Sequence, residues 1–208
     1  MIGRPLTPLI AQAARDEWGT RRYSVSMFGF LKQKRDAEEF GKSFAGFVTK
    51  FALGASSEKV DEQIAGMISK GASVERIRPE LAAFLCFCRW AGMASALQKG
   101  KIKERDFEVF YGAYLEELGV LSSTIDVTAS GSLSYSTFWE WLQARLDRYI
   151  EITNLHADGR EAIRQVIDNF CDFACKGEPT EGLKFELQHT YLMVSGNMYD
   201  ILAGTRFV

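Results

Sequence analysis

The chain has 208 residues, a formal net charge of −2, 47% hydrophobic residues and 25% charged residues. These values are ordinary for a globular protein, and the 4 prolines and 12% aromatic residues argue against extended disorder. The slightly acidic balance argues against a nucleic-acid-binding protein. The length allows one large domain or two small ones, and we expect a single helical domain over residues 1–208.

The N-terminal part predicts a short amphipathic helix over residues 6–18, followed by a basic and aromatic stretch over residues 19–35. No long apolar run precedes Arg15, so no signal peptide is expected. The stretch has no acidic residue, and cations mixed with rings are typical of partner-binding and membrane surfaces. A structural linker fits the same composition. The candidate partner-binding residues are Arg21, Arg22, Tyr23, Phe28, Phe30, Lys32, Lys34 and Arg35.

The beginning of the chain is open to a second interpretation. Met27 and the residues after it have the pattern of a translation start, which would make the preceding residues an extension. An N-terminal extension over residues 1–35 is therefore an alternative to a helix that belongs to the domain. Contact of residues 19–35 with a membrane surface is the weaker of the uses considered for this stretch.

Two helices are predicted next, over residues 36–53 and 57–70, with Gly54 and Gly71 as their stops. The first of them carries a stripe of apolar residues at helical spacing, which is typical of a packed core. Its members are Phe40, Phe44, Phe47, Val48 and Phe51.

The central helix, predicted over about 79–98, has no polar face. A helix that is apolar on all sides either lies in a core or crosses a membrane. A span needs about 20 apolar residues, whereas this run is shorter and carries Arg89 at its centre, where a charge is costly in a bilayer. We therefore expect no transmembrane segment. The other helices should surround this one, with Gly92 among the small residues that allow close approach.

Arg89 needs a partner inside a core, because a buried unpaired charge is strongly destabilising. The expected partner is a carboxylate or a backbone carbonyl. The alternative is an acidic ligand held in a pocket of the bundle. The candidate ligand-binding residues for that pocket are Arg89, Phe84, Phe87, Phe40 and Phe44.

The second half predicts four more helices, over residues 103–118, 138–153, 158–176 and 180–203. Gly119 is expected to end the first, and a capping box formed by Thr137 and Glu140 to begin the second. The Ser/Thr-rich segment 120–137 lies between two sub-bundles, 1–119 and 138–208. It is either a short β-hairpin near 124–135 or a crossover. The predicted fold is an all-α bundle of about seven or eight helices.

Trp139 and Trp141 cannot both lie on the inner face of the helix predicted over residues 138–153. At least one of them should be partly exposed. Tryptophan is frequent among the residues that dominate protein–protein binding energies. Both tryptophans are therefore candidate partner-binding residues.

No phosphate-binding loop, nucleophile elbow or zinc-protease motif is present, and the chain has only 2 histidines. Glu186 and His189 match the Glu-x-x-His spacing of carboxylate-bridged di-iron bundles, but the second pair that such a site needs is missing. The cysteines, Cys86, Cys88, Cys171 and Cys175, are expected to be buried thiols. We assign no catalytic residue, no metal and no cofactor.

Charge is unevenly placed along the chain. Residues 1–104 carry 17 basic and 11 acidic side chains, and residues 105–208 carry 8 and 16. Either the two halves pack with complementary fields, or a basic surface attracts an acidic partner. The first hypothesis is a cytoplasmic, non-catalytic protein that binds another protein or itself, as adaptor, immunity or other regulatory proteins do. The alternatives are a bundle that binds a small apolar or acidic ligand in its core, and an enzyme or metal-binding bundle that uses Glu186 and His189.

Overall fold

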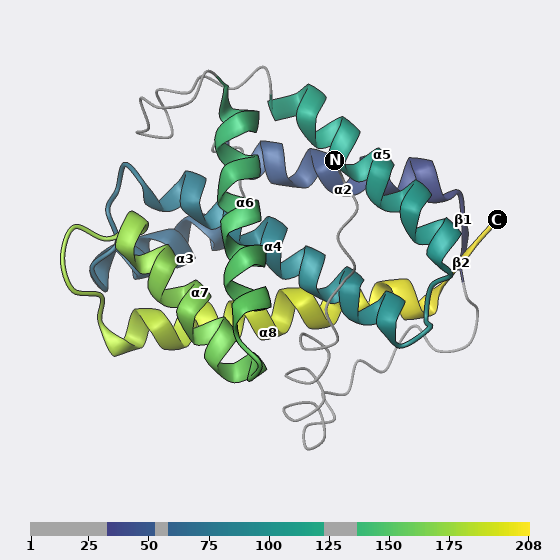
Figure 1. The fold of residues 1–208 in the computed structure, drawn as a ribbon. Coiled ribbons are helices and arrows are strands. Elements are labelled where there is room, and N and C mark those ends of the chain that lie inside the picture. Colours follow the sequence, from purple (N-terminus) through teal and green to yellow (C-terminus); the bar gives the residue numbers. More distant parts are fainter. Residues whose placement is uncertain (1–32, 53–57, 123–136) are drawn as a thin grey trace.

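The structure, a computed structural model, describes residues 33–52, 58–122 and 137–208 (Figure 1). Three predictions lie outside these residues: the helix over 6–18, the hairpin near 124–135 and most of the basic stretch over 19–35. The candidate partner-binding residues outside the described ranges are Arg21, Arg22, Tyr23, Phe28, Phe30 and Lys32.

The described ranges form seven helices and two short strands, which confirms the all-α prediction. In chain order the elements are β1 (Gln33–Arg35), α2 (Ala37–Ala52), α3 (Glu58–Ser69), α4 (Ile77–Gln98), α5 (Glu104–Ser122), α6 (Phe138–Leu155), α7 (Gly159–Ala174), α8 (Glu181–Gly204) and β2 (Thr205–Phe207). The strands were not predicted. They pair in parallel, with Gln33 opposite Thr205, and so join the two ends of the described chain.

Side-chain caps begin the last three helices where the sequence predicts them. The capping box is present, because the Glu140 N–H donates to Thr137 Oγ1 at 3.2 Å and the Thr137 N–H donates to a Glu140 carboxylate oxygen at 3.3 Å. Asp158 Oδ1 accepts from the Arg160 N–H at 2.9 Å. Thr180 caps α8 in the same way. These bonds satisfy backbone donors that have no partner within the helix.

One predicted helix end is wrong. The helix α5 does not stop at Gly119 but continues to Ser122. Gly119 faces the Trp139 ring, and a Cβ atom placed there would lie 3.4 Å from the indole, in ordinary van der Waals contact. A glycine inside a helix costs about 1 kcal/mol relative to alanine, and α5 continues through it.

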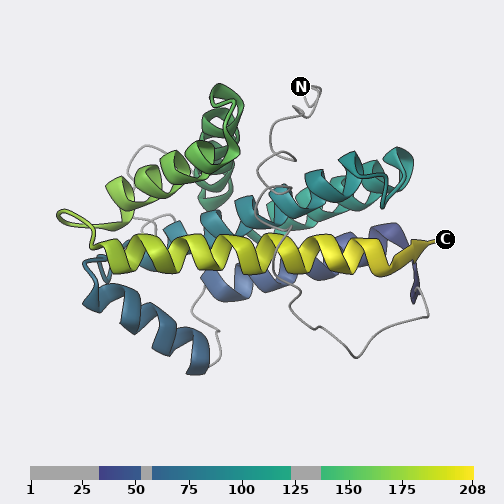
Figure 2. The ribbon, with the colours of Figure 1, turned by 90° about the horizontal axis from the view of Figure 1, so that it is seen from below.

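The helix α4 lies at the centre of the bundle, as predicted, and contacts α2, α3, α6, α7 and α8. From residue 81 to 97, all side chains are buried except those of Leu85, Arg89 and Leu97, which are half-buried. Figure 2 shows α8 running along α4 for most of its length. Within the described ranges α4 is the one helix long and apolar enough to cross a membrane, and 83% of its most apolar window is buried by the protein.

Gly92 lies where the backbones of α4 and α8 come close together. A Cβ atom placed on Gly92 would overlap the carbonyl oxygen of Ser195 and would lie 2.8 Å from the Cβ atom of Met198. The absence of a side chain is therefore what allows the two backbones to touch.

The four phenylalanines predicted as walls of a ligand pocket contact other rings of the protein. On α4, Phe84 and Phe87 are fully buried, with Phe84 packed on Phe170 (5.4 Å between centroids) and Phe87 on Tyr149 (5.6 Å). On α2, Phe40 and Phe44 belong to a ring cluster whose other members are Phe110 and Phe207.

A buried ion pair joins α4 to α6. The Arg145 guanidinium donates to the Glu80 carboxylate at 2.9 and 3.0 Å, and both side chains are only 7% exposed. The guanidinium also lies 3.7 Å from the centroid of the Phe173 ring on α7. Burial raises the pKa of Glu80, and the positive charge of Arg145 opposes that rise.

Candidate functional site

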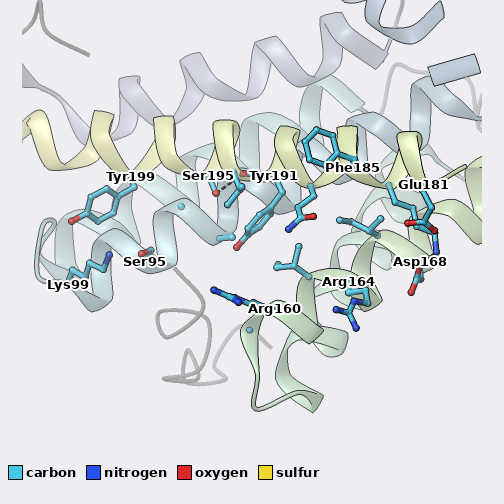
Figure 3. A pocket seen from close by; sticks show the side chains of 18 residues that line it. Ser95, Lys99, Arg160, Arg164, Asp168, Glu181, Phe185, Tyr191, Ser195 and Tyr199 are labelled. Carbon is cyan, nitrogen blue, oxygen red and sulfur yellow. Dashed lines mark hydrogen bonds and ion pairs between the residues drawn. The ribbon is translucent and has the colours of Figure 1, made fainter. Parts of the chain in front are cut away.

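A pocket of about 480 Å³ lies where α4, α7 and α8 meet (Figure 3). From α4, Ala91, Gly92 and Ser95 line it with little more than backbone, which leaves the space open. The helices α7 and α8 supply the larger apolar and charged groups. A pocket of this size holds a small organic molecule rather than a single inorganic ion.

Helical periodicity explains how α7 forms its wall. Ile163 and Ile167, one turn apart, both line the pocket and are nearly fully buried. A second row one turn apart, Arg160, Arg164 and Asp168, also lines the pocket and is more exposed. Residues spaced by four lie along one side of a helix, so α7 presents an apolar row beside a charged one.

Most charges at one end of the pocket are paired. Lys184 of α8 contacts Asp168 of α7 at 2.7 Å, and this hydrogen bond raises the pKa of Lys184. Arg164 contacts Glu161 at 3.0 Å. Glu181 lines the same end. This end is therefore close to neutral or slightly negative.

The other end carries more positive charge. Lys99, from the end of α4, lies 4.8 Å from the centroid of the Tyr199 ring. Figure 3 shows Arg160 below the ring of Tyr191 in that view. Among the residues that the structure describes, Arg160 has no carboxylate partner. It stands in the first turn of α7, where its backbone N–H is capped by the Asp158 carboxylate at 2.9 Å.

Arg89 lies outside this pocket, on the side of α4 that faces α2. Its guanidinium donates to the carbonyl oxygen of Phe44 at 3.1 Å and lies 5.5 Å from the centroid of the Phe44 ring. The expected contact with a backbone carbonyl is confirmed. None of the five candidate ligand-binding residues lines the pocket between α4, α7 and α8.

The Arg89 contacts lead to a stability prediction. Arg89→Met should lower the free energy of unfolding by about 1–2 kcal/mol, because it keeps the apolar stem and loses a charge-assisted hydrogen bond. Arg89→Ala should cost more, since it also leaves a space beside Phe44. Thermal melts of both variants measure the difference. Equal losses would show that the charge matters and the stem does not.

The remaining candidate partner-binding residues lie apart from the pocket. Trp141 is 3% exposed and packs on Phe138, so its ring is within the core. Trp139 is half-buried against Gly119. Arg35 is exposed and lies over the Phe40 ring, and Lys34 stands beside it in β1.

Glu186 and His189, both on α8, do not pair with each other. Glu186 forms an ion pair with Lys70, which follows α3, and His189 is exposed. Within the described ranges no three His, Cys, Asp or Glu residues gather in a group that could hold a metal ion.

The cysteines are buried free thiols, as the sequence predicts. Burial raises the pKa of Cys86 to about 11 and that of Cys171 to about 12. A thiol must lose its proton to act as a nucleophile, so both should be unreactive at neutral pH.

Comparisons with protein-family models, with curated proteins and with solved structures gave no match. Function therefore has to be inferred from the pocket itself. The sequence interpretation missed Lys99, Arg160 and Tyr191, because each looks like an ordinary residue of an amphipathic helix. The row of charges on α7 was a visible signal, but its meaning depends on which helices face it.

Proposed function

We propose that the protein is a non-catalytic binding protein that holds a small organic anion in the pocket between α4, α7 and α8. The proposal depends on one observation above all. Arg160, which is exposed and has no carboxylate partner among the described residues, lines a pocket that also contains the buried side chains of Ile163 and Ile167. An arginine in such a place is suited to a carboxylate or phosphate, which its planar guanidinium can bind through two parallel hydrogen bonds.

The neighbours of Arg160 support an anion rather than a neutral ligand. Lys99 adds a second positive charge to the same end of the pocket. Burial raises the pKa of Tyr199, so its phenol remains protonated at neutral pH and can donate a hydrogen bond. The buried side chains of Ile163 and Ile167 lower the local dielectric and strengthen these interactions.

The lining supports binding more than catalysis. Among the described residues that line the pocket there is no histidine and no cysteine. Asp168 is occupied by Lys184 at 2.7 Å, so it is a poor candidate for a general base. A nucleophile in hydrogen-bond contact with a base, which covalent catalysis requires, is not formed by these side chains.

Two sources can supply the anion. One is a free small acid. The other is a protein partner that presents an acidic side chain or its C-terminal carboxylate, in line with the first hypothesis from the sequence. The shared chemistry is a carboxylate or phosphate, and a binding experiment can separate the two sources.

The test is isothermal titration of the purified protein with benzoate, phenyl phosphate, neutral benzamide and a short acidic peptide. We expect at least one anion to bind and benzamide not to bind. Arg160→Gln should weaken anion binding by about 10- to 100-fold, the effect of one charge-assisted hydrogen bond. Rising salt should weaken binding as well.

The matched control is Arg148→Gln. Arg148 is exposed on α6, pairs with Glu151 at 2.8 Å and does not line the pocket. This variant should bind like the wild type. Equal binding of benzamide and benzoate, or unchanged anion binding by Arg160→Gln, would contradict the proposal. Binding of the peptide alone would assign the anion to a protein partner.

A further inference from the structure

We infer that the ligand is an amphiphile, with an anionic head near Arg160 and Lys99 and an apolar body along Ile163 and Ile167. This inference rests on the proposed function and specifies the class of anion. A soluble alkyl carboxylate or alkyl phosphate has this chemistry.

Charge is separated along the length of the pocket. The head end holds Lys99 and Arg160, whereas the far end holds Asp168 and Glu181 (Figure 3). Lys184 neutralises Asp168 at 2.7 Å, which leaves no net positive charge there to attract an anion. An anionic ligand should therefore place its charge at the first end only.

The distance between the two ends of the pocket favours a ligand that has an apolar body as well as an anionic head group. Arg160 and Asp168 are eight residues apart on α7, which corresponds to roughly 12 Å along the helix. A head group alone would fill only the first few ångströms of that length. The volume of about 480 Å³ likewise exceeds the needs of a small inorganic anion.

Two buried isoleucines of α7 lie between the two ends, beside Arg164 and Gln188, which also line the pocket. The isoleucines are Ile163 and Ile167, and Ala91 is buried on α4. Leu192 of α8, which follows Tyr191, is half-buried and lines the head end. Phe185 stands at the far rim with 72% of its surface exposed. When the ligand buries a methylene group against such a lining, its affinity should rise by roughly fourfold for each CH₂ group.

The experiment compares butyrate, octanoate and neutral octanamide by isothermal titration, below the concentration at which the longer chains form micelles. Octanoate should bind at least tenfold more tightly than butyrate, and octanamide much more weakly than octanoate. Arg160→Gln should weaken both acids. Ile167→Ala should weaken octanoate severalfold and leave butyrate unchanged, because Ile167 precedes Asp168 at the far end of the pocket, which only the longer chain reaches.

Met193→Ala is the matched control for the apolar wall. Met193 of α8 is exposed and does not line the pocket. It should bind octanoate like the wild type. Circular dichroism and a thermal melt check that all variants are folded.

The outcomes separate this inference from the proposed function. If butyrate and octanoate bind equally and both depend on Arg160, the anion site stands and the amphiphile inference fails. If neither acid binds, or if octanamide binds as well as octanoate, the amphiphile inference fails, and benzoate and phenyl phosphate then decide the proposed function separately. Binding to vesicles of phosphatidylcholine with phosphatidylglycerol is measured as well. Binding to these vesicles without binding of octanoate would overturn the inference in favour of a membrane surface.

Discussion

Glu80→Leu should lower the free energy of unfolding by about 3–5 kcal/mol, because it leaves the Arg145 guanidinium buried without a counter-charge. Arginine cannot lose its proton in a protein, so the cost cannot be avoided by neutralisation. Adding Arg145→Met to Glu80→Leu should recover much of the loss, since two apolar side chains then fill the space at similar volume. Urea unfolding of the two single variants and the double variant measures this cycle.

The two single variants should differ in their pH dependence. In Arg145→Met the remaining carboxyl can take a proton, and burial already raises the pKa of Glu80. Loss of Arg145 removes a charge that lowers this pKa, so the folded state holds the proton to higher pH than the unfolded chain. That variant should therefore lie closest to the wild type in acid and lose stability as the pH rises. The Glu80→Leu variant lacks this carboxyl, so its loss of stability should change less with pH.

The exposed pair of Arg148 and Glu151 is the control for this cycle. Its side chains are 49% and 59% exposed. Solvent screens such a pair, so its coupling energy should be below about 1 kcal/mol. If the buried pair gave a coupling energy no larger than this, the interpretation of Glu80 and Arg145 as a coupled charge pair would be wrong.

Gly92→Ala should destabilise the protein by about 2–3 kcal/mol, and Gly92→Leu by more. The new Cβ atom would overlap the Ser195 carbonyl oxygen, which is backbone, and would come within 2.8 Å of Met198. A flexible side chain could move aside, but here α4 and α8 would have to separate along a buried interface. Chemical unfolding of the variants measures the loss.

Gly112→Ala in α5 is the matched control for Gly92→Ala. No atom lies within 4 Å of a Cβ atom placed there. Replacing an unhindered helical glycine by alanine should raise stability by about 0.5–1 kcal/mol. The same substitution should thus have opposite signs at the two positions. A gain in stability at Gly92 would contradict the close approach of α4 and α8.

The burial of the central helix could be predicted from sequence, because the helix has no polar face that could be exposed to solvent. The starts of α6, α7 and α8 could also be predicted, since caps are local signals within four residues. The Glu80–Arg145 pair could not, because 65 residues separate its members. Glu80 alone looks like an ordinary acidic residue of a first helical turn.

The pocket was beyond prediction for a related reason. Periodicity shows that Ile163 and Ile167 share one face of α7, but it does not show which helices meet that face. Arg160 beside them resembles any solvated cation until α4 and α8 are in place. Phe84 and Phe87 were correctly expected to point inward, yet spacing alone did not reveal that protein rings fill the space around them. The partner-binding role assigned to residues 19–35 stays a prediction.

The burial of α4 by α8 has a consequence for the synthesis of the chain. Roughly a hundred residues separate the end of α4 from the end of α8. At ribosomal rates of about 5–20 residues per second, α4 leaves the ribosome ~5–20 s before α8 can cover it. During that interval the most apolar segment of the described chain has an open side that chaperones, or other nascent chains, can bind. A messenger truncated before α8 should therefore yield aggregated or chaperone-bound protein.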